Sequence, residues 1–152
     1  MTLLISSIVD SKKLDRAWSL DQRALFHPNP KQKKKLWATS IGLCRTLLEK
    51  YTSPSSDRYQ ILSKLALIYQ HQSDFNNAKR SLDMIKKDNP RDPIMMFNFG
   101  NLYRAMNQPK RAIEWYKNAI RAAKNFSQGR ELFLSSLYQY KAILAIKKPR
   151  KS

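Results

Sequence analysis

Apolar residues recur along most of this chain at intervals of three and four positions, which places them on one side of an α-helix. Such stripes predict helices over residues 11–26, 34–51, 56–71, 74–87, 93–106, 109–124 and 127–146. We therefore expect an all-α protein of about seven helices. Since an amphipathic helix buries its stripe only against another element, these helices are expected to pack on one another.

Capping and turn residues stand at the ends of the predicted helices. Asp92-Pro93 offers an N-cap followed by a proline in the first turn, where the N–H that proline lacks would have no partner within the helix. Asn107-Gln108-Pro109 has the same form, and Ser73-Asp74 offers a cap without proline. His27-Pro28-Asn29-Pro30 is expected to end the first helix, because proline cannot continue a helix from within.

Two segments of the chain match each other at an offset of 34 residues, one starting at Tyr59 and the other at Pro93. Each unit predicts two antiparallel helices, and such units bury their stripes by stacking. A small residue, Ala66 or Gly100, lies between bulky ones and permits a close approach of the second helix. The matched positions keep their size class: Leu62, Leu65, Ala66, Tyr69, Ala78, Leu82 and Ile85 correspond to Met96, Phe99, Gly100, Tyr103, Ala112, Tyr116 and Ala119.

This pattern resembles the tetratricopeptide repeat (TPR), a helix–turn–helix unit with the form W-x₂-L-G-x₂-Y…A-x₃-F…P. The resemblance covers residues 59–126; no tryptophan opens either unit, and Lys124 stands where the family has proline. It implies a helix–turn–helix solenoid with degenerate flanking helices. We expect a single domain over 1–152, with N-terminal helices and a basic linker in 1–58, repeats at 59–92 and 93–126, a capping helix over 127–146 and a basic tail over 147–152.

The resemblance also implies a groove, lined by the first helix of each repeat, that binds a peptide or protein. Some members of the family hold a terminal carboxylate with five clamp residues, of which only Asn98 is present here. Binding of a chaperone tail is therefore not expected, and the groove suits a helix or an extended segment. The residues expected to line it are Gln60, Ser63, Lys64, Leu67, Gln70, Phe97, Asn98, Asn101, Arg104, Glu131 and Tyr138.

Charge adds a second kind of candidate surface. The 152 residues include 29 Lys+Arg and 11 Asp+Glu, a net charge of +18, whose self-repulsion favours an acidic partner. The first repeat carries only +2 of this charge. Structured RNA is the favoured partner, without sequence-specific readout, and an acidic protein or an anionic membrane surface are the alternatives. The expected contact residues are Lys31, Lys33, Lys34, Lys35, Lys110, Arg111, Lys117, Arg121, Lys124, Lys147, Lys148, Arg150 and Lys151.

Residues suited to catalysis or metal binding are few. Cys44 lies on an apolar stripe, which indicates a buried thiol, and His71 lies at a helix end, where a capping or solvated role is expected. One cysteine and two histidines do not suffice for a Cys-rich or His-centred metal site, and the three glycines are too scattered for a phosphate-binding loop. We expect no enzyme activity, no cofactor and no small-molecule substrate.

The first nine residues are mostly apolar and are followed by Asp10, without the basic start of a secretory signal. They are expected to pack on the protein or to dock on a partner, and no apolar run is long enough to cross a bilayer. The sequence predicts an intracellular, soluble or complex-bound adaptor in the cytoplasm or an organelle. It would bind a protein in its groove and RNA through its basic surfaces, as a ribosome-type ribonucleoprotein component or assembly factor. The alternative is an assembly chaperone or scaffold of a membrane complex, for example a photosystem.

Overall fold

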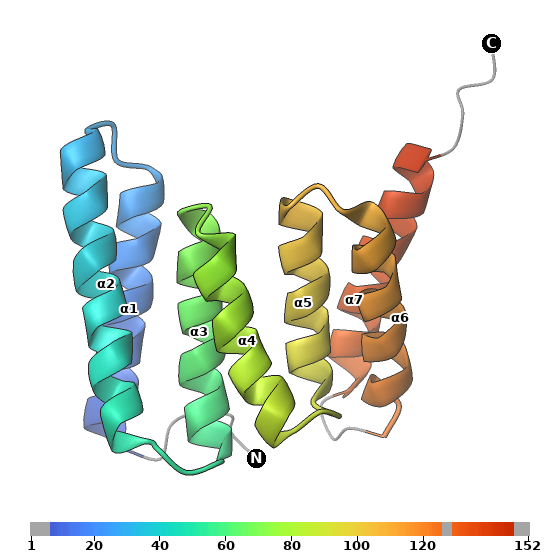
Figure 1. Ribbon diagram of the computed structural model, residues 1–152, viewed down its shortest axis with the longest axis horizontal. Coiled ribbons are helices and arrows are strands. Elements are labelled where there is room, and N and C mark those ends of the chain that lie inside the picture. The colour runs from blue at the N-terminus through green and yellow to red at the C-terminus, as the bar shows by residue number, and fades with distance from the viewer. Residues whose placement is uncertain (1–6, 126–128, 148–152) are drawn as a thin grey trace. The chain divides into compact units, whose positions relative to one another are not determined.

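The computed structural model describes residues 7–125 and 129–147. Within these ranges it contains seven α-helices and no strand (Figure 1), which confirms the all-α class. The helices are α1 (Ile8–Leu25), α2 (Pro30–Lys50), α3 (Ser56–His71), α4 (Phe75–Asp88), α5 (Pro93–Ala105), α6 (Pro109–Ala123) and α7 (Gly129–Lys147).

The start of α2 lies four residues before the predicted one. The side chain of Asn29 caps this helix by accepting hydrogen bonds from the backbone N–H groups of Lys31 and Gln32, and Pro30 follows in the first turn. Asn29 and Pro30, which were expected only to end α1, therefore also begin α2. As a consequence, Lys31–Lys35 lie in the first turns of a helix, and the predicted basic linker is wrong at this point.

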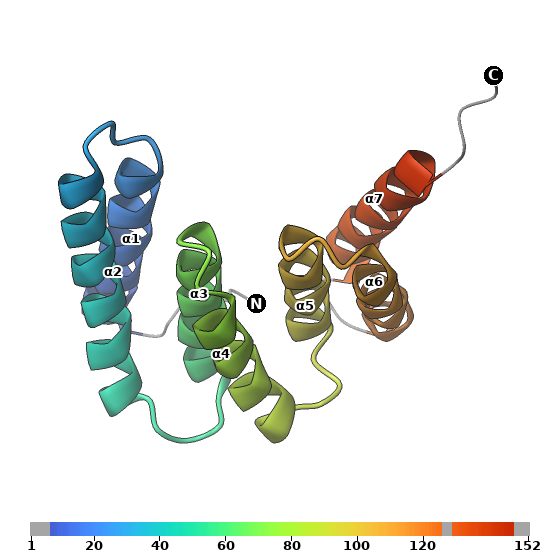
Figure 2. The ribbon, with the colours of Figure 1, turned by 45° about the horizontal axis from the view of Figure 1, so that its top comes forward.

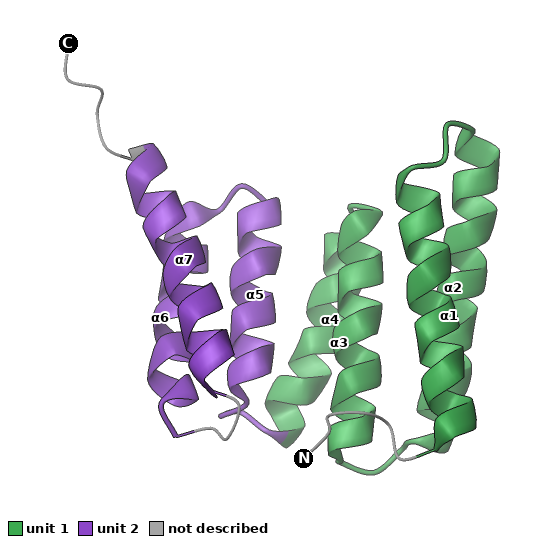
Figure 3. Cartoon of the chain, turned by 180° about the vertical axis from the view of Figure 1, so that it is seen from behind, with its two compact units in different colours: residues 1–88 green, residues 89–152 purple. Residues whose placement is uncertain are grey.

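The helices group into two compact units, residues 1–88 and 89–152 (Figure 3). In the first unit, α1 pairs with α2 and α3 pairs with α4, while α3 also packs against both helices of the first pair. The apolar stripes of α1 to α4 meet in its core. Its buried side chains include Leu14, Leu20, Cys44, Leu47, Ile61, Leu62, Leu65, Ile68, Leu82 and Ile85.

In the second unit, α5 and α6 form a hairpin, and α7 packs against both. Tyr116 of α6 is fully buried and faces Gly100 of α5. The predicted capping helix, α7, exposes large apolar side chains, with Leu134 53 % exposed and Tyr138 71 % exposed. Because a helix that closes an array is expected to be polar on its outer face, α7 is not a typical cap.

The turns inside the two hairpins of the repeats have the same backbone conformation. Ser73 and Asn107 both adopt a left-handed conformation, with φ of 60° and 57°, and they are 34 residues apart. The residue after each donates a hydrogen bond across the turn: the N–H of Asp74 to the carbonyl of Tyr69 (2.9 Å), and that of Gln108 to Tyr103 (2.8 Å). This is the Schellman arrangement of a helix end. The side chain of Gln108 makes no cap hydrogen bond to α6, contrary to the cap predicted there.

Candidate functional site

The predicted groove residues of the first unit share one face of α3. Gln60, Ser63, Lys64, Leu67 and Gln70 are spaced by three and four residues, and all are partly buried. The ammonium group of Lys64 is not directed freely into solvent, because its Nζ lies 4.0 Å from the centre of the Trp18 ring on α1. Burial lowers the pKa of Lys64. Lys64 and Trp18 thus form one aromatic–cationic surface across α1 and α3.

Behind this surface, a buried carboxylate joins three helices. Asp21 of α1 is fully buried, and its Oδ1 accepts a hydrogen bond from the indole N–H of Trp37 on α2 at 2.9 Å. Its Oδ2 lies 2.7 Å from Nδ1 of His71 on α3. The predicted capping or solvated role of His71 is therefore wrong. Because a buried carboxylate is tolerated only when it is hydrogen-bonded, these contacts fix the packing of α1, α2 and α3.

A histidine bound to a carboxylate also occurs in nucleophilic active sites, where a cysteine can be the third member, and Cys44 is the cysteine of this chain. The thiol of Cys44 is fully buried, and burial raises its pKa to about 12. A thiol with such a pKa stays protonated near neutral pH and is a poor nucleophile. The arrangement therefore supports a structural role for Asp21 and His71. Within the described residues, no group of His, Cys, Asp and Glu is suited to hold a metal ion.

The predicted groove residues of the second unit belong to α5 and α7. Two of them hold Tyr116 in place: the Phe97 ring lies 5.8 Å from the Tyr116 ring, and Asn101 accepts a hydrogen bond from the Tyr116 hydroxyl. Asn98 is only 8 % exposed, so it does not contribute to an open groove surface. The residues of this set that are open to solvent are Arg104, Glu131 and Tyr138.

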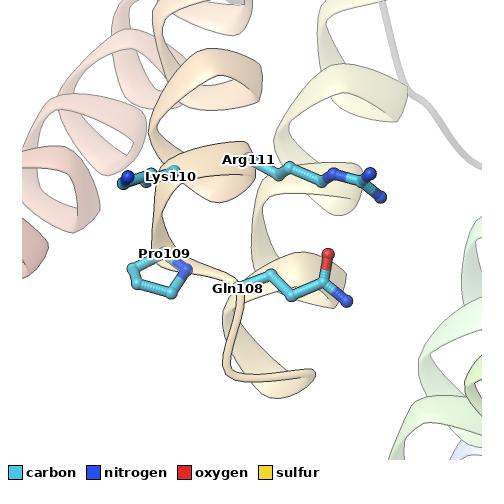
Figure 4. Close-up of a pocket in the computed structure, with 4 residues that line it drawn as sticks. All are labelled: Gln108, Pro109, Lys110 and Arg111. Atoms are coloured by element: carbon cyan, nitrogen blue, oxygen red, sulfur yellow. The ribbon is translucent and has the colours of Figure 1, made fainter.

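The basic residues of α6 do not converge on one point. Lys110 and Arg111, with Gln108 and Pro109, line a shallow depression of about 350 Å³, and the two cations leave α6 on opposite sides (Figure 4). Arg111 lies 5.6 Å from the centre of the Tyr103 ring. The other predicted contacts of this helix and its end are spread along it: Lys117, which lies 5.7 Å from the Tyr140 ring, Arg121, which donates to Asn118, and the exposed Lys124.

The N-terminal lysines form a compact group on α2. Lys31, Lys34 and Lys35 are exposed, whereas Lys33 is partly buried and lies over the Trp37 ring at 5.6 Å. At the other end of the chain, Lys147 is the last residue of α7, and Lys148, Arg150 and Lys151 lie outside the described residues. Of the apolar N-terminal segment, residues 1–6 lie outside them too, while Ile8 and Val9 begin α1 and are 74 % and 64 % exposed.

Three residues that take part in these contacts were not predicted as site residues, namely Trp18, Asp21 and Trp37. A signal for Asp21 existed: it lies seven residues after Leu14 and three before Ala24, on the buried stripe of α1. A carboxylate on such a stripe needs a hydrogen-bonding partner from another helix. The sequence could not show that this partner is His71, because the two residues are 50 positions apart.

Comparison with known families finds a match for the α5–α6 hairpin. A family described as the tetratricopeptide repeat matches residues 94–126, a range that begins at the second residue of α5, includes α6 and extends three residues beyond it. The match supports the predicted family over this segment of the chain. Repeats of this class bind other proteins, which supports a role as a protein-interaction adaptor. No curated protein matches the chain in a sequence search. None of the described helices combines the length and apolar character that crossing a membrane requires.

Proposed function

We propose that the protein is a non-catalytic adaptor that binds a protein neighbour through its repeats and RNA through its basic surfaces. It would act as a component or assembly factor of a ribosome-type ribonucleoprotein. The observation that carries this proposal is the excess of 18 positive charges on a chain that also contains a tetratricopeptide repeat. Phosphate groups are a partner that such a surface can recognise through charge alone.

The positions of the acidic residues support this proposal. Two of the eleven carboxylates, Asp10 and Asp21, are buried and serve contacts between helices. Asp83 pairs with Lys79 on α4, and Asp88 lies 3.8 Å from Arg58. Asp10 pairs with Lys50 at the end of α2, but none of these four acids pairs with Lys31, Lys33, Lys34 or Lys35 or with the basic residues of α6. These cations are available to an external polyanion.

The RNA part of this function is tested by titrating the full chain against total RNA over a series of salt concentrations. Binding through 6–10 phosphate contacts should weaken by about three to five decades between 50 and 200 mM salt. Replacing Lys110, Arg111, Lys117 and Arg121 by glutamine should lower both the affinity and the salt dependence. The matched control replaces four basic residues of the first repeat, Lys79, Arg80, Lys86 and Lys87, which should change binding less. A flat salt response, or no binding, would contradict the RNA role.

The protein part is tested by purifying the native complex at low salt. Ribonucleoprotein subunits together with nucleic acid are the expected result. Subunits of a membrane complex without nucleic acid would instead favour the assembly-scaffold alternative. In both cases, Leu67→Glu on α3 should weaken the interaction if the partner contacts the predicted groove face. Asn76→Glu, which introduces the same side chain at an exposed position of α4 outside that face, is the matched control.

A further inference from the structure

The loop that joins α1 to α2 carries the most exposed of the large apolar side chains in the described part of the chain. Phe26 is 83 % exposed, whereas phenylalanine is normally among the buried residues of a domain. Within the first unit, the α1–α2 hairpin extends beyond the end of the α3–α4 hairpin, so this loop stands clear of its neighbours (Figures 1 and 2). The ring of Phe26 is therefore accessible to a partner.

Local contacts hold this loop in one conformation. The N–H of His27 donates to the carbonyl of Ala24, and the N–H of Asn29 donates to Nδ1 of the His27 ring at 3.0 Å. The side chain of Asn29 then caps α2, and Pro28 and Pro30 restrict the backbone on both sides of it. A ring displayed on such a fixed loop loses little conformational freedom when a partner binds.

The loop is surrounded by positive charge. Residues 22–48 contain no Asp or Glu. Arg23 lies one turn before Phe26 on the same side of α1, and Lys31, Lys34 and Lys35 are exposed on the first turns of α2. Among the described residues, none of these four cations forms an ion pair. Lysines in the first turn of a helix are also unfavourable for its dipole, so they do not serve the stability of α2.

We propose that this hairpin tip, formed by Phe26 with Arg23, Lys31, Lys34 and Lys35, binds single-stranded RNA. One base stacks on the Phe26 ring, and the adjacent phosphates contact the four cations. This inference rests on the proposed function and assigns a place and a strand type to the RNA contact. A duplex offers phosphates but no free base face to the ring. An interfacial membrane helix would need an apolar stripe, whereas Phe26 is followed by the polar residues His27 and Asn29.

The test measures fluorescence anisotropy of a labelled twelve-nucleotide oligouridine with the full chain at 50 mM salt. Loss of one stacked base in Phe26→Ala should weaken binding about 5- to 150-fold. Phe26→Trp should retain or strengthen it. The matched control, Ile8→Ala, removes another highly exposed apolar side chain of α1 and should leave the affinity unchanged. Circular dichroism verifies that each variant keeps its helix content.

The salt dependence of binding distinguishes the contribution of the Phe26 ring from that of the four cations. Phe26→Ala should leave the slope of log K against log salt unchanged. Replacing Lys31, Lys34 and Lys35 by glutamine should reduce that slope by about two, since each lost contact with a single strand contributes roughly 0.7. A twelve-base-pair RNA duplex should bind Phe26→Ala as well as it binds the wild type.

Three outcomes would overturn the hairpin-tip proposal. If the wild type binds oligouridine and Phe26→Ala binds it equally well, the tip is not the stacking site, while the proposed RNA role stands. If Phe26→Trp loses binding, stacking is not the contact. If the wild type binds no RNA but binds vesicles of phosphatidylcholine with phosphatidylserine, and Phe26→Ala does not, the tip binds a membrane surface and the proposed function fails as well.

Discussion

Gly100 of α5 packs so closely against the ring of Tyr116 of α6 that a side chain at position 100 would collide with the ring. A methyl group on Gly100 would lie 2.5 Å from Cε1 of Tyr116, well inside van der Waals contact. The tyrosine cannot easily move away, because it is fully buried and its hydroxyl donates to Asn101. The small residue of the repeat pattern is thus required by one specific aromatic ring.

Gly100→Ala should therefore destabilise the second unit by about 1–3 kcal/mol, the usual effect of overpacking a core. Urea unfolding of the full chain measures the change in free energy. Gly42→Ala is the matched control, since Gly42 lies inside α2 with no neighbouring atom within 4 Å of the added methyl group. It should stabilise by about 0.5–1 kcal/mol, because alanine is the better helix former. Equal effects of the two substitutions would contradict the close contact.

The left-handed residue of the first repeat is not glycine, although glycine is preferred at this position. Ser73→Gly should stabilise the first unit by about 0.5–1 kcal/mol, because it relieves the strain of a side chain at positive φ. Asn107→Gly should give a smaller stabilisation of the second unit, since asparagine tolerates a positive φ. Urea midpoints of the two variants measure the difference. A stabilisation by Ser73→Val, whose branched side chain disfavours positive φ, would contradict the assigned turn.

The contact between Asp21 and His71 should contribute measurably to the first unit. His71→Ala leaves the buried carboxylate of Asp21 with fewer donors and should destabilise by about 1.5–3 kcal/mol, the range for hydrogen bonds to charged groups. Tryptophan fluorescence during urea unfolding reports on this unit through Trp18 and Trp37 when it is measured in a Trp115→Phe background, which removes the signal of the second unit. Gln22→Ala is the control. Gln22 donates to the same carboxylate at 3.1 Å but is partly exposed, so its removal should lower the free energy of unfolding by less than His71→Ala does.

Asp10 predicts a specific dependence of stability on pH. Its Oδ2 accepts hydrogen bonds from the ammonium of Lys50 at 2.5 Å and the hydroxyl of Tyr51 at 2.7 Å, and these lower its pKa. Since the pKa is lower in the folded state than in the unfolded state, the stabilisation is present above the unfolded-state pKa of 3.8 and is lost as the pH falls through the folded-state value. The same contact raises the pKa of Tyr51 to about 12.

Asp10→Asn should therefore be less stable than the wild type at pH 7, and the difference should shrink as the pH falls below 3.8 and through the lowered folded-state pKa, because the carboxyl group of the wild type becomes protonated in both states. Denaturant unfolding at a series of pH values measures this convergence. A difference that stays constant from pH 7 to pH 2 would show that the charge of Asp10 is not its source. Asp83→Asn, in the exposed pair with Lys79, should have little effect on stability at pH 7.

The helices were predictable because their signals are local. The cap of Asp92 on α5 and the close packing at Gly100 follow from residue types and spacing along a few turns. The start of α2 was predicted too late because Asn29-Pro30 was interpreted as the end of α1 alone, although it has the same form as Asp92-Pro93. A pair of residues can end one helix and begin the next.

The candidate surfaces were less predictable, since they depend on contacts between helices. The exposed lysines of α2 could be identified from composition, but the exposure of Phe26 and the burial of Asn98 could not. The spacing of Lys64 places it on one face of α3, yet only the packing of α1 brings it over the Trp18 ring. Sequence spacing defines the face on which a side chain lies, whereas its partners depend on tertiary structure.

The buried carboxylate of Asp21 also limits where the chain can be truncated. A fragment that began at the first recognisable repeat would remove α1 and α2, leaving His71 without its acceptor and the packed face of α3 in water. Such a fragment should be less soluble and less cooperative in unfolding than the whole chain. The two N-terminal helices are therefore an integral part of the fold, and a minimal expressible version of the first unit has to include Ser7, the residue that caps α1.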